Sequence, residues 1–353
     1  MKKFNIIVPA LLAVLAVASC CGHSKEKVAD NKVKNVIIMI GDGMGLQQVG
    51  AFMLENRYAP TSFDRAQSVA ICKTYSNNNW ITDSGAAATA IATGHKTDNA
   101  KIGMTPDGEK VPTIMEIAKA KGMSTGLIVT SYLTDATPAG FAAHTSHRKN
   151  FDDIASQIKQ LSPDILAGGG LDYLGSYFTR YAATPDAFYA VDTLPAIGIF
   201  APKNMKPAPE RGDYLSKASQ HAVKLLEGND KGFFVMIEGS QIDYACHNND
   251  PETTIAEMCD FDKAVNLMFD YADSNPGTLV VVLADHETGG LSIVSNNTDY
   301  TSSESGVQYK FGTSSHSASP VMAYAYGTGA CNIKGVIENT DIFGILKSMI
   351  TAN

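Results

Sequence analysis

Hydrophobic residues along this chain gather in short continuous runs separated by longer amphipathic stretches. The runs, rich in β-branched residues, lie at 36–40, 126–130, 232–237 and 278–283. Short apolar runs of this kind are typical of parallel strands buried on both faces. Strands that alternate with helices predict an α/β fold, with a mainly parallel central sheet and helices on both of its faces in three layers.

Several helix ends can be located from capping patterns. Thr113 and Glu116 have the spacing of a capping box, and Gly122 is placed to end that helix. Asp250 and Pro251 predict an N-cap followed by a proline in the first turn. Apolar residues then continue at helical spacing from 255 to 272, so we expect a long amphipathic helix there.

Ser84 stands between an aspartate and a glycine, immediately ahead of an alanine-rich run. Alanine favours helix, and the preceding Thr82 and Asp83 are good capping residues, so Ser84 is predicted at the first turn of a helix. Unpaired backbone N–H groups at such a terminus attract anions, phosphate above all. On this stretch alone, an ordinary capped helix is the simpler interpretation.

The composition predicts one large domain. The 353 residues are 44% hydrophobic, which is enough for a single core, and we assign residues 35–353 to one catalytic domain. Residues 171–211 are less regular, with several prolines, and are predicted to be a modest insertion. The net charge is −8 and no run of Lys or Arg occurs, so nucleic-acid binding is not expected.

The N-terminal segment has the features of an export signal. Lys2 and Lys3 precede an apolar stretch, 6–18, that is too short to span a bilayer. It ends in Val-Ala-Ser-Cys, which resembles the lipobox of bacterial lipoproteins, so 1–19 is predicted to be a signal peptide and Cys20 a lipid anchor. A simple cleaved signal is the alternative. Polar residues 20–34 then form a flexible tether, and the protein is expected on the periplasmic side or the outer membrane. The other cysteines leave the disulfide pairing open.

Acidic residues stand at the ends of three predicted strands. Asp42 follows the run 36–40, Glu238 follows the run 232–237, and Asp285 follows the run 278–283. Ligands bind outside the carboxyl ends of strands in open α/β sheets, and acids that converge there repel one another unless cations neutralise them. His247 and His286 lie beside the acidic segments, which adds nitrogen donors that zinc accepts. Together these residues predict a metal site.

The motifs taken together resemble the alkaline phosphatases. The similar segments are 35–45, 82–90, 135–148, 238–247, 284–290 and 314–316, and they occur in order between about Asn35 and Gly327. The resemblance implies two Zn²⁺ and one Mg²⁺. The first zinc would be held by Asp243, His247 and His316, and the second by Asp42, Asp285 and His286. The magnesium would be held by Asp42, Thr137 and Glu238, with Asp135 acting through water.

The same resemblance implies the reaction. Ser84 would attack the phosphorus of a small phosphate monoester and form a phosphoserine, while Arg148 would hold two phosphate oxygens. A phosphodiesterase, a sulfatase and a phosphate-binding lipoprotein without activity are the rival hypotheses. Tyr244 stands where well-known members of the family have lysine or histidine. Trp80 either borders the substrate pocket or packs in the core, and homodimerisation stays open.

Overall fold

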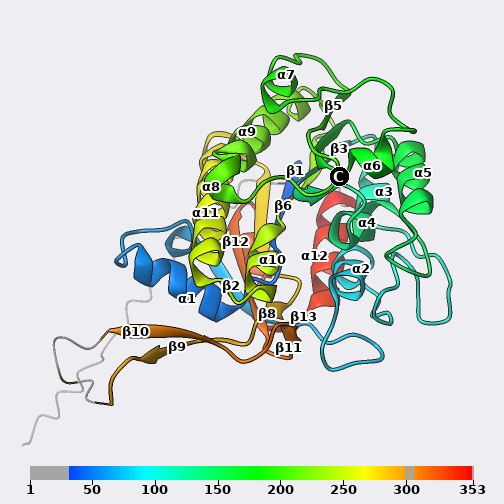
Figure 1. The fold of residues 1–353 in the computed structure, drawn as a ribbon. Helices are drawn as coiled ribbons and strands as arrows, with labels where there is room; N and C mark the ends of the chain where they lie inside the picture. Colours follow the sequence, from blue (N-terminus) through cyan, green and yellow to red (C-terminus); the bar gives the residue numbers. More distant parts are fainter. Residues whose placement is uncertain (1–31, 299–300, 302–305, 352–353) are drawn as a thin grey trace, which may run out of the picture. The chain divides into compact units, whose positions relative to one another are not determined.

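A nine-stranded sheet forms the centre of the computed structural model, which describes residues 32–298, 301 and 306–351 (Figure 1). The strand order is β13-β2-β12-β7-β1-β6-β3-β4-β5. Within this sheet only β12 runs against the other strands, because it pairs antiparallel with both β2 and β7 while the remaining pairs are parallel. The predicted α/β fold with a mainly parallel sheet is confirmed.

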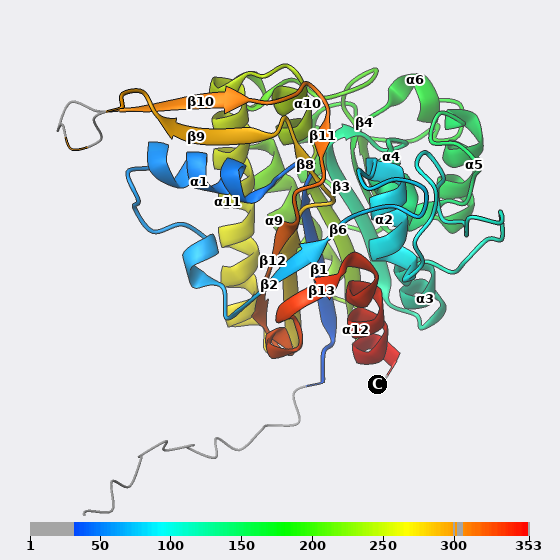
Figure 2. The ribbon, with the colours of Figure 1, turned by 90° about the horizontal axis from the view of Figure 1, so that it is seen from below.

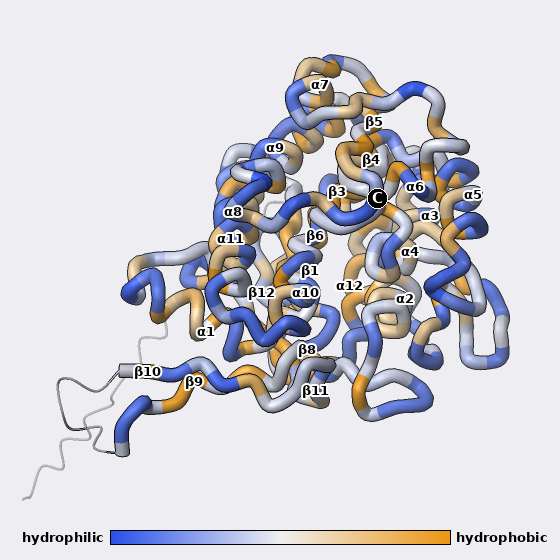
Figure 3. The backbone as a smooth tube through the Cα atoms, in the orientation of Figure 1, coloured by the Kyte–Doolittle hydropathy of each residue, from blue (hydrophilic) through white to orange (hydrophobic). Residues whose placement is uncertain are grey.

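The four apolar runs all form strands of this sheet. They are β1 (Asn35–Gly41), β3 (Ser124–Tyr132), β6 (Phe233–Gly239) and β7 (Thr278–Leu283). The other five strands are β2 (Ser68–Lys73), β4 (Ile165–Gly169), β5 (Ala196–Ile199), β12 (Val321–Gly327) and β13 (Gly335–Glu338). Figure 3 shows the central strands as largely hydrophobic. Their side chains on both faces are buried, which is why they read as continuous apolar runs.

Helices cover both faces of the sheet, as Figures 1 and 2 show. One face is covered by α1 (Leu46–Glu55), α9 (Tyr214–Leu226) and α11 (Pro251–Ser274). The other is covered by α2 (Ser84–Thr93), α3 (Ile114–Ala120), α4 (Ala136–Ala142) and α12 (Asn339–Thr351). The capping box at Thr113 and Glu116 and the cap at Asp250 are both present, so these predicted helix starts are confirmed.

The helix that begins at Ser84 is buried along its whole length. It packs so closely on α4 that a Cβ atom added at Gly140 would lie 2.6 Å from the Cβ of Ala88. Only glycine fits at this crossing, since real Cβ atoms do not approach that closely. The contact fixes the position of α2 in the fold, and with it the serine at its first turn.

The irregular segment 171–211 is joined to the main sheet. It contains α6 (Leu171–Leu174), α7 (Pro185–Tyr189), the edge strand β5 and α8 (Ala208–Arg211). The preceding helix, α5, spans Phe151–Leu161. Because β5 pairs with β4, part of the segment extends the sheet and does not merely decorate it.

Small elements at the C-terminal half complete the edge that holds the site. They are α10 (Gln241–His247), β8 (Glu287–Thr288), β11 (His316–Ser317) and the hairpin of β9 (Leu291–Ser295) with β10 (Val307–Phe311). β8 pairs antiparallel with β11. Two short 3₁₀ helices lie at Phe63–Arg65 and Ala330–Asn332.

The predicted signal peptide, Cys20 and most of the tether lie outside the described residues. Val33, placed in the tether by sequence, is already buried, so the folded part begins slightly earlier than residue 35. Across the described residues, no helix combines the length and apolar character needed to cross a bilayer. The cysteines in this part of the chain, at 72, 246, 259 and 331, are free thiols.

Candidate active site

The carboxyl ends of three neighbouring strands bring the predicted acids together. β1 lies between β6 and β7, and Ile40 is in register with both Glu238 and Leu283. Asp42 directly follows β1, Asp285 is the second residue after the end of β7, and Glu238 is still within β6. All three acids are almost completely buried, so parallel pairing alone assembles a buried acidic cluster at this edge.

Within the described part of the chain, each of these acids has one carboxylate oxygen without a hydrogen-bond partner. Asp42 Oδ1, Glu238 Oε2 and Asp285 Oδ2 have no hydrogen-bond donor among the described residues. Burial raises the pKa of Asp42 well above its usual value, and the charges of Asp285 and Asp243 raise it further. Burial followed by the charge of Asp243 raises the pKa of Asp285 to about 7. Buried carboxylates of this kind are paired or coordinate metals, so the cluster fits cations.

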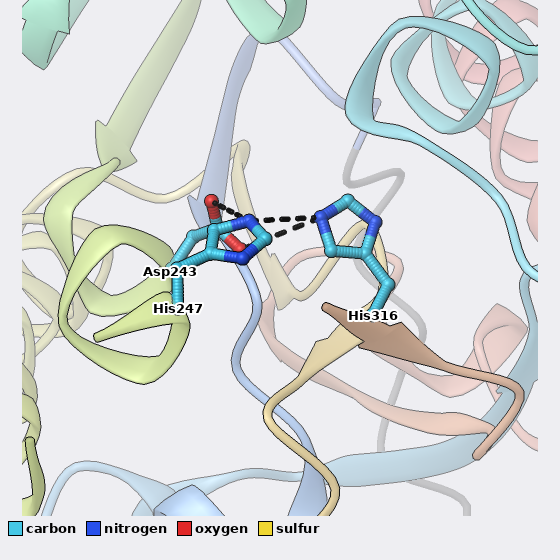
Figure 4. A group of neighbouring side chains, drawn as sticks. All are labelled: Asp243, His247 and His316. Carbon is cyan, nitrogen blue, oxygen red and sulfur yellow. Dashed lines mark hydrogen bonds and ion pairs between the residues drawn. The ribbon is translucent and has the colours of Figure 1, made fainter. Parts of the chain in front are cut away.

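Two histidines and an aspartate converge beside this cluster. Figure 4 shows Asp243 and His247, from α10, facing His316, from β11. His247 Nε2 lies 3.2 Å from Asp243 Oδ2 and 3.2 Å from His316 Nε2. The other ring nitrogens, both Nδ1, bond the backbone carbonyls of Ser314 and Thr82, which fixes the ring orientations. The ligand atoms lie within 4.8 Å of one another, a set that suits one metal ion.

The charges of this trio depend on its aspartate. Burial acts to raise the pKa of Asp243, but the hydrogen bond from His247 and the charges of His286 and His316 outweigh it and lower that pKa. The same hydrogen bond raises the pKa of His247 to about 9. Thr288 also donates to Asp243 and so fixes its carboxylate.

A second group surrounds His286. Its Nε2 lies 3.2 Å from Asp285 Oδ2 and 3.5 Å from Asp42 Oδ1. Burial lowers the pKa of His286, and the charge of His316 lowers it further, so the ring is neutral, the form that binds metals. Asp42, Asp243 and His286 also offer ligand atoms within 4.8 Å of one another, so Asp243 stands between the two groups.

Ser84 lies against the second group. Its Oγ is 3.2 Å from His286 Nε2, although the two residues are 202 positions apart in the chain. Ser84 is the first residue of α2, and Asp83 caps the helix by accepting from Ala86 N at 2.9 Å. The serine therefore combines a helix N-terminus with the acidic and imidazole groups.

Arg148 is held by two carboxylates. One Nη atom lies 3.1 Å from Asp83 Oδ2, and the other lies 3.4 Å from Asp135 Oδ1. Burial acts to lower its pKa, but the charges of Asp135 and Asp83 raise it, so the guanidinium stays charged. Because Asp83 also caps the helix of Ser84, the arginine and the serine are fixed relative to each other.

A third group of oxygen donors lies on the far side of Glu238. Thr137 is buried in the first turn of α4, and its side chain acts to lower the pKa of Glu238. Burial raises the pKa of Glu238 well above its usual value, and the charge of Asp135 raises it further. Asp135 itself caps α4 and accepts a 2.9 Å hydrogen bond from the hydroxyl of Tyr244. The donors here are oxygens only, a set that suits magnesium.

The structure thus brings together the site residues named from sequence, and it adds residues that sequence reasoning did not single out. Asp83 holds Arg148 as well as capping α2, and Thr288 fixes Asp243. Both lie within motifs already noted, but only the fold shows what they contact. His144, in contrast, points away from the site and pairs with Glu116 at 2.9 Å. Trp80 is 80% exposed, which excludes core packing.

Comparison with known proteins gives a consistent picture. The family model described as alkaline phosphatase matches residues 33–174 and 187–308. Alkaline phosphatase 4 of Bacillus subtilis strain 168 is 38% identical over 77% of this chain and 65% of its own length. Alkaline phosphatase 3 of the same organism is 35% identical over 83% and 71%. The chain thus spans about two thirds of the length of these relatives.

Solved structures match more completely. The alkaline phosphatase from the Antarctic bacterium TAB5 is 33% identical with a TM-score of 0.85, covering 91% of this chain and 99% of that one. The cold-active enzyme from a psychrophilic Shewanella species is 30% identical with a TM-score of 0.83, covering 90% and 99%. The family match over most of the chain, and a shared fold with solved members, show that this chain belongs to the alkaline phosphatase family.

Proposed function

We propose that this protein hydrolyses phosphate monoesters and releases inorganic phosphate through a phosphoserine intermediate on Ser84. The observation that carries the proposal is the hydroxyl of Ser84, placed at a helix N-terminus and 3.2 Å from His286 beside buried, unneutralised acids. A serine hydroxyl is a weak nucleophile unless a neighbouring group or a metal activates it.

The donor sets support a two-zinc, one-magnesium assignment. Asp243, His247 and His316 would hold the first zinc, and Asp42, Asp285 and His286 the second. Oxygens of Asp42, Thr137 and Glu238 would hold magnesium. For a histidine-to-aspartate variant of the TAB5 enzyme, magnesium is described in a site called M3. Bound cations supply Lewis acidity, which lowers the pKa of a nearby hydroxyl and neutralises charge in the transition state.

Ser84 and Arg148 have separate roles in the proposed reaction. Ser84 Oγ gives its proton to solvent and forms a bond to phosphorus as the bond to the leaving oxygen breaks, and the leaving oxygen takes up a proton to depart as the alcohol. Arg148 donates two N–H groups to nonbridging phosphate oxygens, because its guanidinium is a planar fork whose orientation Asp83 and Asp135 fix. A water then attacks phosphorus on the opposite side, Ser84 regains its proton, and phosphate leaves.

One comparison tests this proposal against its rivals. The purified chain is assayed with a monoester, a diester and a sulfate ester, with and without a chelator, and its bound metals are measured. We expect monoester turnover to dominate and to be lost with the chelator and in Ser84→Ala. Ser219→Ala, which removes a buried serine of α9, is the matched control and should keep its activity.

The intermediate is tested directly by trapping. Brief reaction with a ³²P-labelled monoester followed by acid quenching should leave label on the peptide that contains Ser84. Monoester turnover that survives both Ser84→Ala and metal removal would refute the mechanism. Preferential turnover of the diester or sulfate ester would favour the rival enzymes instead, and phosphate binding without turnover would favour a binding protein.

We also infer export with a lipid anchor at Cys20, on the basis of the apolar stretch and lipobox alone. Mass spectrometry of the mature N-terminus, with Cys20→Ser as the control, tests it. An unmodified mature N-terminus would contradict it.

A further inference from the structure

Three aromatic side chains form a cluster next to the arginine of the site. Tyr132 ends β3, Phe151 begins α5, and Tyr173 lies on α6. The ring centroid of Tyr132 is 5.8 Å from that of Phe151 and 5.4 Å from that of Tyr173, and the last two rings are 4.4 Å apart. Because each ring is only partly buried, the cluster presents aromatic surface outside the core.

Tyr132 connects this cluster to the residues proposed to hold phosphate. The backbone N–H of Asp135 donates to the carbonyl of Tyr132 at 2.8 Å, and burial followed by the charge of Asp135 raises the pKa of the Tyr132 hydroxyl. Asp135 in turn lies 3.4 Å from Arg148. The aromatic cluster is therefore linked to the proposed phosphate-binding arginine through Tyr132 and Asp135.

Phe151 and Tyr173 also line a cavity of about 560 Å³. A volume of this size is within the range of small-molecule sites. The cavity is open to solvent. One of its lining residues, Lys149, directly follows Arg148 in the chain. A molecule whose phosphate is held at Arg148 could thus place a ring in it.

The charges of the cavity limit what that ring can carry. Asp152, Asp153 and Asp172 line it, against one cation, Lys149. The carboxylate of Asp152 accepts from Tyr177 at 2.6 Å, and neither it nor its acidic neighbours are neutralised by an ion pair among the described residues. Further phosphate groups would be repelled there, whereas a neutral ring would not.

We propose that this cavity is a subsite for the leaving group, and that it takes a neutral aromatic ring held several bonds from the phosphorus, as in a nucleoside monophosphate. The inference rests on the proposed function, since the phosphate must be bound at Arg148. Aromatic side chains stack on nucleobases of any kind because every base has a π-face. An aliphatic leaving group offers no π-face to stack on Phe151 and Tyr173.

The test compares three monoesters that differ in the position of a ring. They are adenosine 5′-monophosphate, phenyl phosphate and glycerol 2-phosphate, assayed for kcat/KM with the full chain, Tyr173→Ala and Tyr173→Phe. We expect the ratio of kcat/KM between the nucleotide and glycerol phosphate to fall about tenfold in Tyr173→Ala, from the usual contribution of one stacked base. The ratio should return in Tyr173→Phe, and the ratio of phenyl phosphate to glycerol phosphate should stay within twofold.

Tyr189→Ala is the matched control, because Tyr189 is a partly buried tyrosine that lines a separate cavity with His221. It should leave the nucleotide preference unchanged. A fall that is equal for nucleotide and glycerol phosphate, or that occurs in Tyr189→Ala and not in Tyr173→Ala, would overturn the subsite.

Binding of adenosine 5′-monophosphate separates the subsite from the chemistry. Calorimetry with Ser84→Ala, alone and combined with Tyr173→Ala, measures affinity without turnover, and circular dichroism checks that both variants fold. A weaker affinity in the double variant supports the subsite even if Ser84 is not the nucleophile. Equal affinities would refute the subsite and leave the proposed function standing.

Discussion

Replacing Arg211 with methionine should destabilise the protein strongly, because this arginine neutralises two buried acids. Its Nη2 lies 2.6 Å from Glu257 Oε2 and 2.8 Å from Asp260 Oδ2, and its side chain is 1% exposed. Glu257 also accepts a 2.7 Å hydrogen bond from the backbone of Ala208. The three side chains join α8, at the end of the irregular segment, to the long helix α11.

The magnitude follows from the burial of this group. Methionine preserves much of the volume but leaves two carboxylates without a cation, and breaking a buried ion pair in this way costs about 3–5 kcal/mol. Since one arginine serves two acids, we expect the upper half of that range. At about 2 cal/mol/K of unfolding entropy per residue, this corresponds to a fall in Tm of roughly 7 °C.

The cost should also grow with pH. Burial already raises the pKa of Glu257 and of Asp260, while Arg211 lowers both, so its removal raises them further. A carboxyl whose pKa is higher in the folded state binds protons that the unfolded chain has released. Stability is therefore lost as pH rises from the unfolded pKa through the folded one. The destabilisation should be smaller at pH 5 than at pH 8.

Urea unfolding followed by circular dichroism at both pH values measures this. Lys217→Met is the matched control, since it breaks an exposed pair in which Lys217 lies 3.2 Å from Asp213, and it should cost less than about 1 kcal/mol. The reasoning fails if Arg211→Met costs no more than the control at pH 8, or costs more at pH 5.

Three further predictions follow from neighbouring features. Tyr244→Lys should increase inhibition by inorganic phosphate about tenfold, because it places a cation beside Asp135 near the phosphate site; an inhibition constant equal to or higher than that of the wild type would contradict this. Glu116→Gln should cost about 0.5–1 kcal/mol at pH 6 and less at pH 9. Burial acts to lower the pKa of His144, but the hydrogen bond that this histidine donates to Glu116 outweighs burial and raises that pKa. The pair therefore stabilises the fold below the unfolded pKa of His144, and this stabilisation is lost as pH rises through the folded pKa. Urea unfolding that shows the larger cost at pH 9 would reverse the assignment. Gly140→Ala should cost about 1–3 kcal/mol and lower kcat, since the added Cβ would displace the helix that bears the proposed nucleophile. Gly344→Ala is the control and should be neutral or stabilising, because a Cβ added there would have nothing within 4 Å. Equal effects of the two substitutions in unfolding and turnover assays would rule out the packing argument.

Sequence patterns predicted the centre of the fold but not its edges. The runs that became β1, β3, β6 and β7 are buried on both faces, so their composition alone identifies them. In β2 the buried and exposed positions alternate, so its short apolar run at 69–72 does not reflect burial on both faces. The β9–β10 hairpin is half-exposed and gives no continuous run.

The site shows the same division. Asp42, Glu238 and Asp285 were located because strand ends meet at one edge of a parallel sheet. That Asp83 would hold Arg148, or that Tyr132 would join the site to an aromatic cluster, depends on loop paths that no local pattern specifies.

The placement of β1 has a consequence for how the chain is made. Val36 belongs to the first strand to emerge during synthesis, yet it pairs with Phe234 on one side and Leu279 on the other. This apolar strand must wait for most of the chain, which favours slow folding and a long exposure to aggregation and to chaperones. His316 comes later still. A partly synthesised chain therefore cannot assemble the complete set of proposed metal ligands. Such an enzyme would not hydrolyse phosphate esters until its last strands are in place.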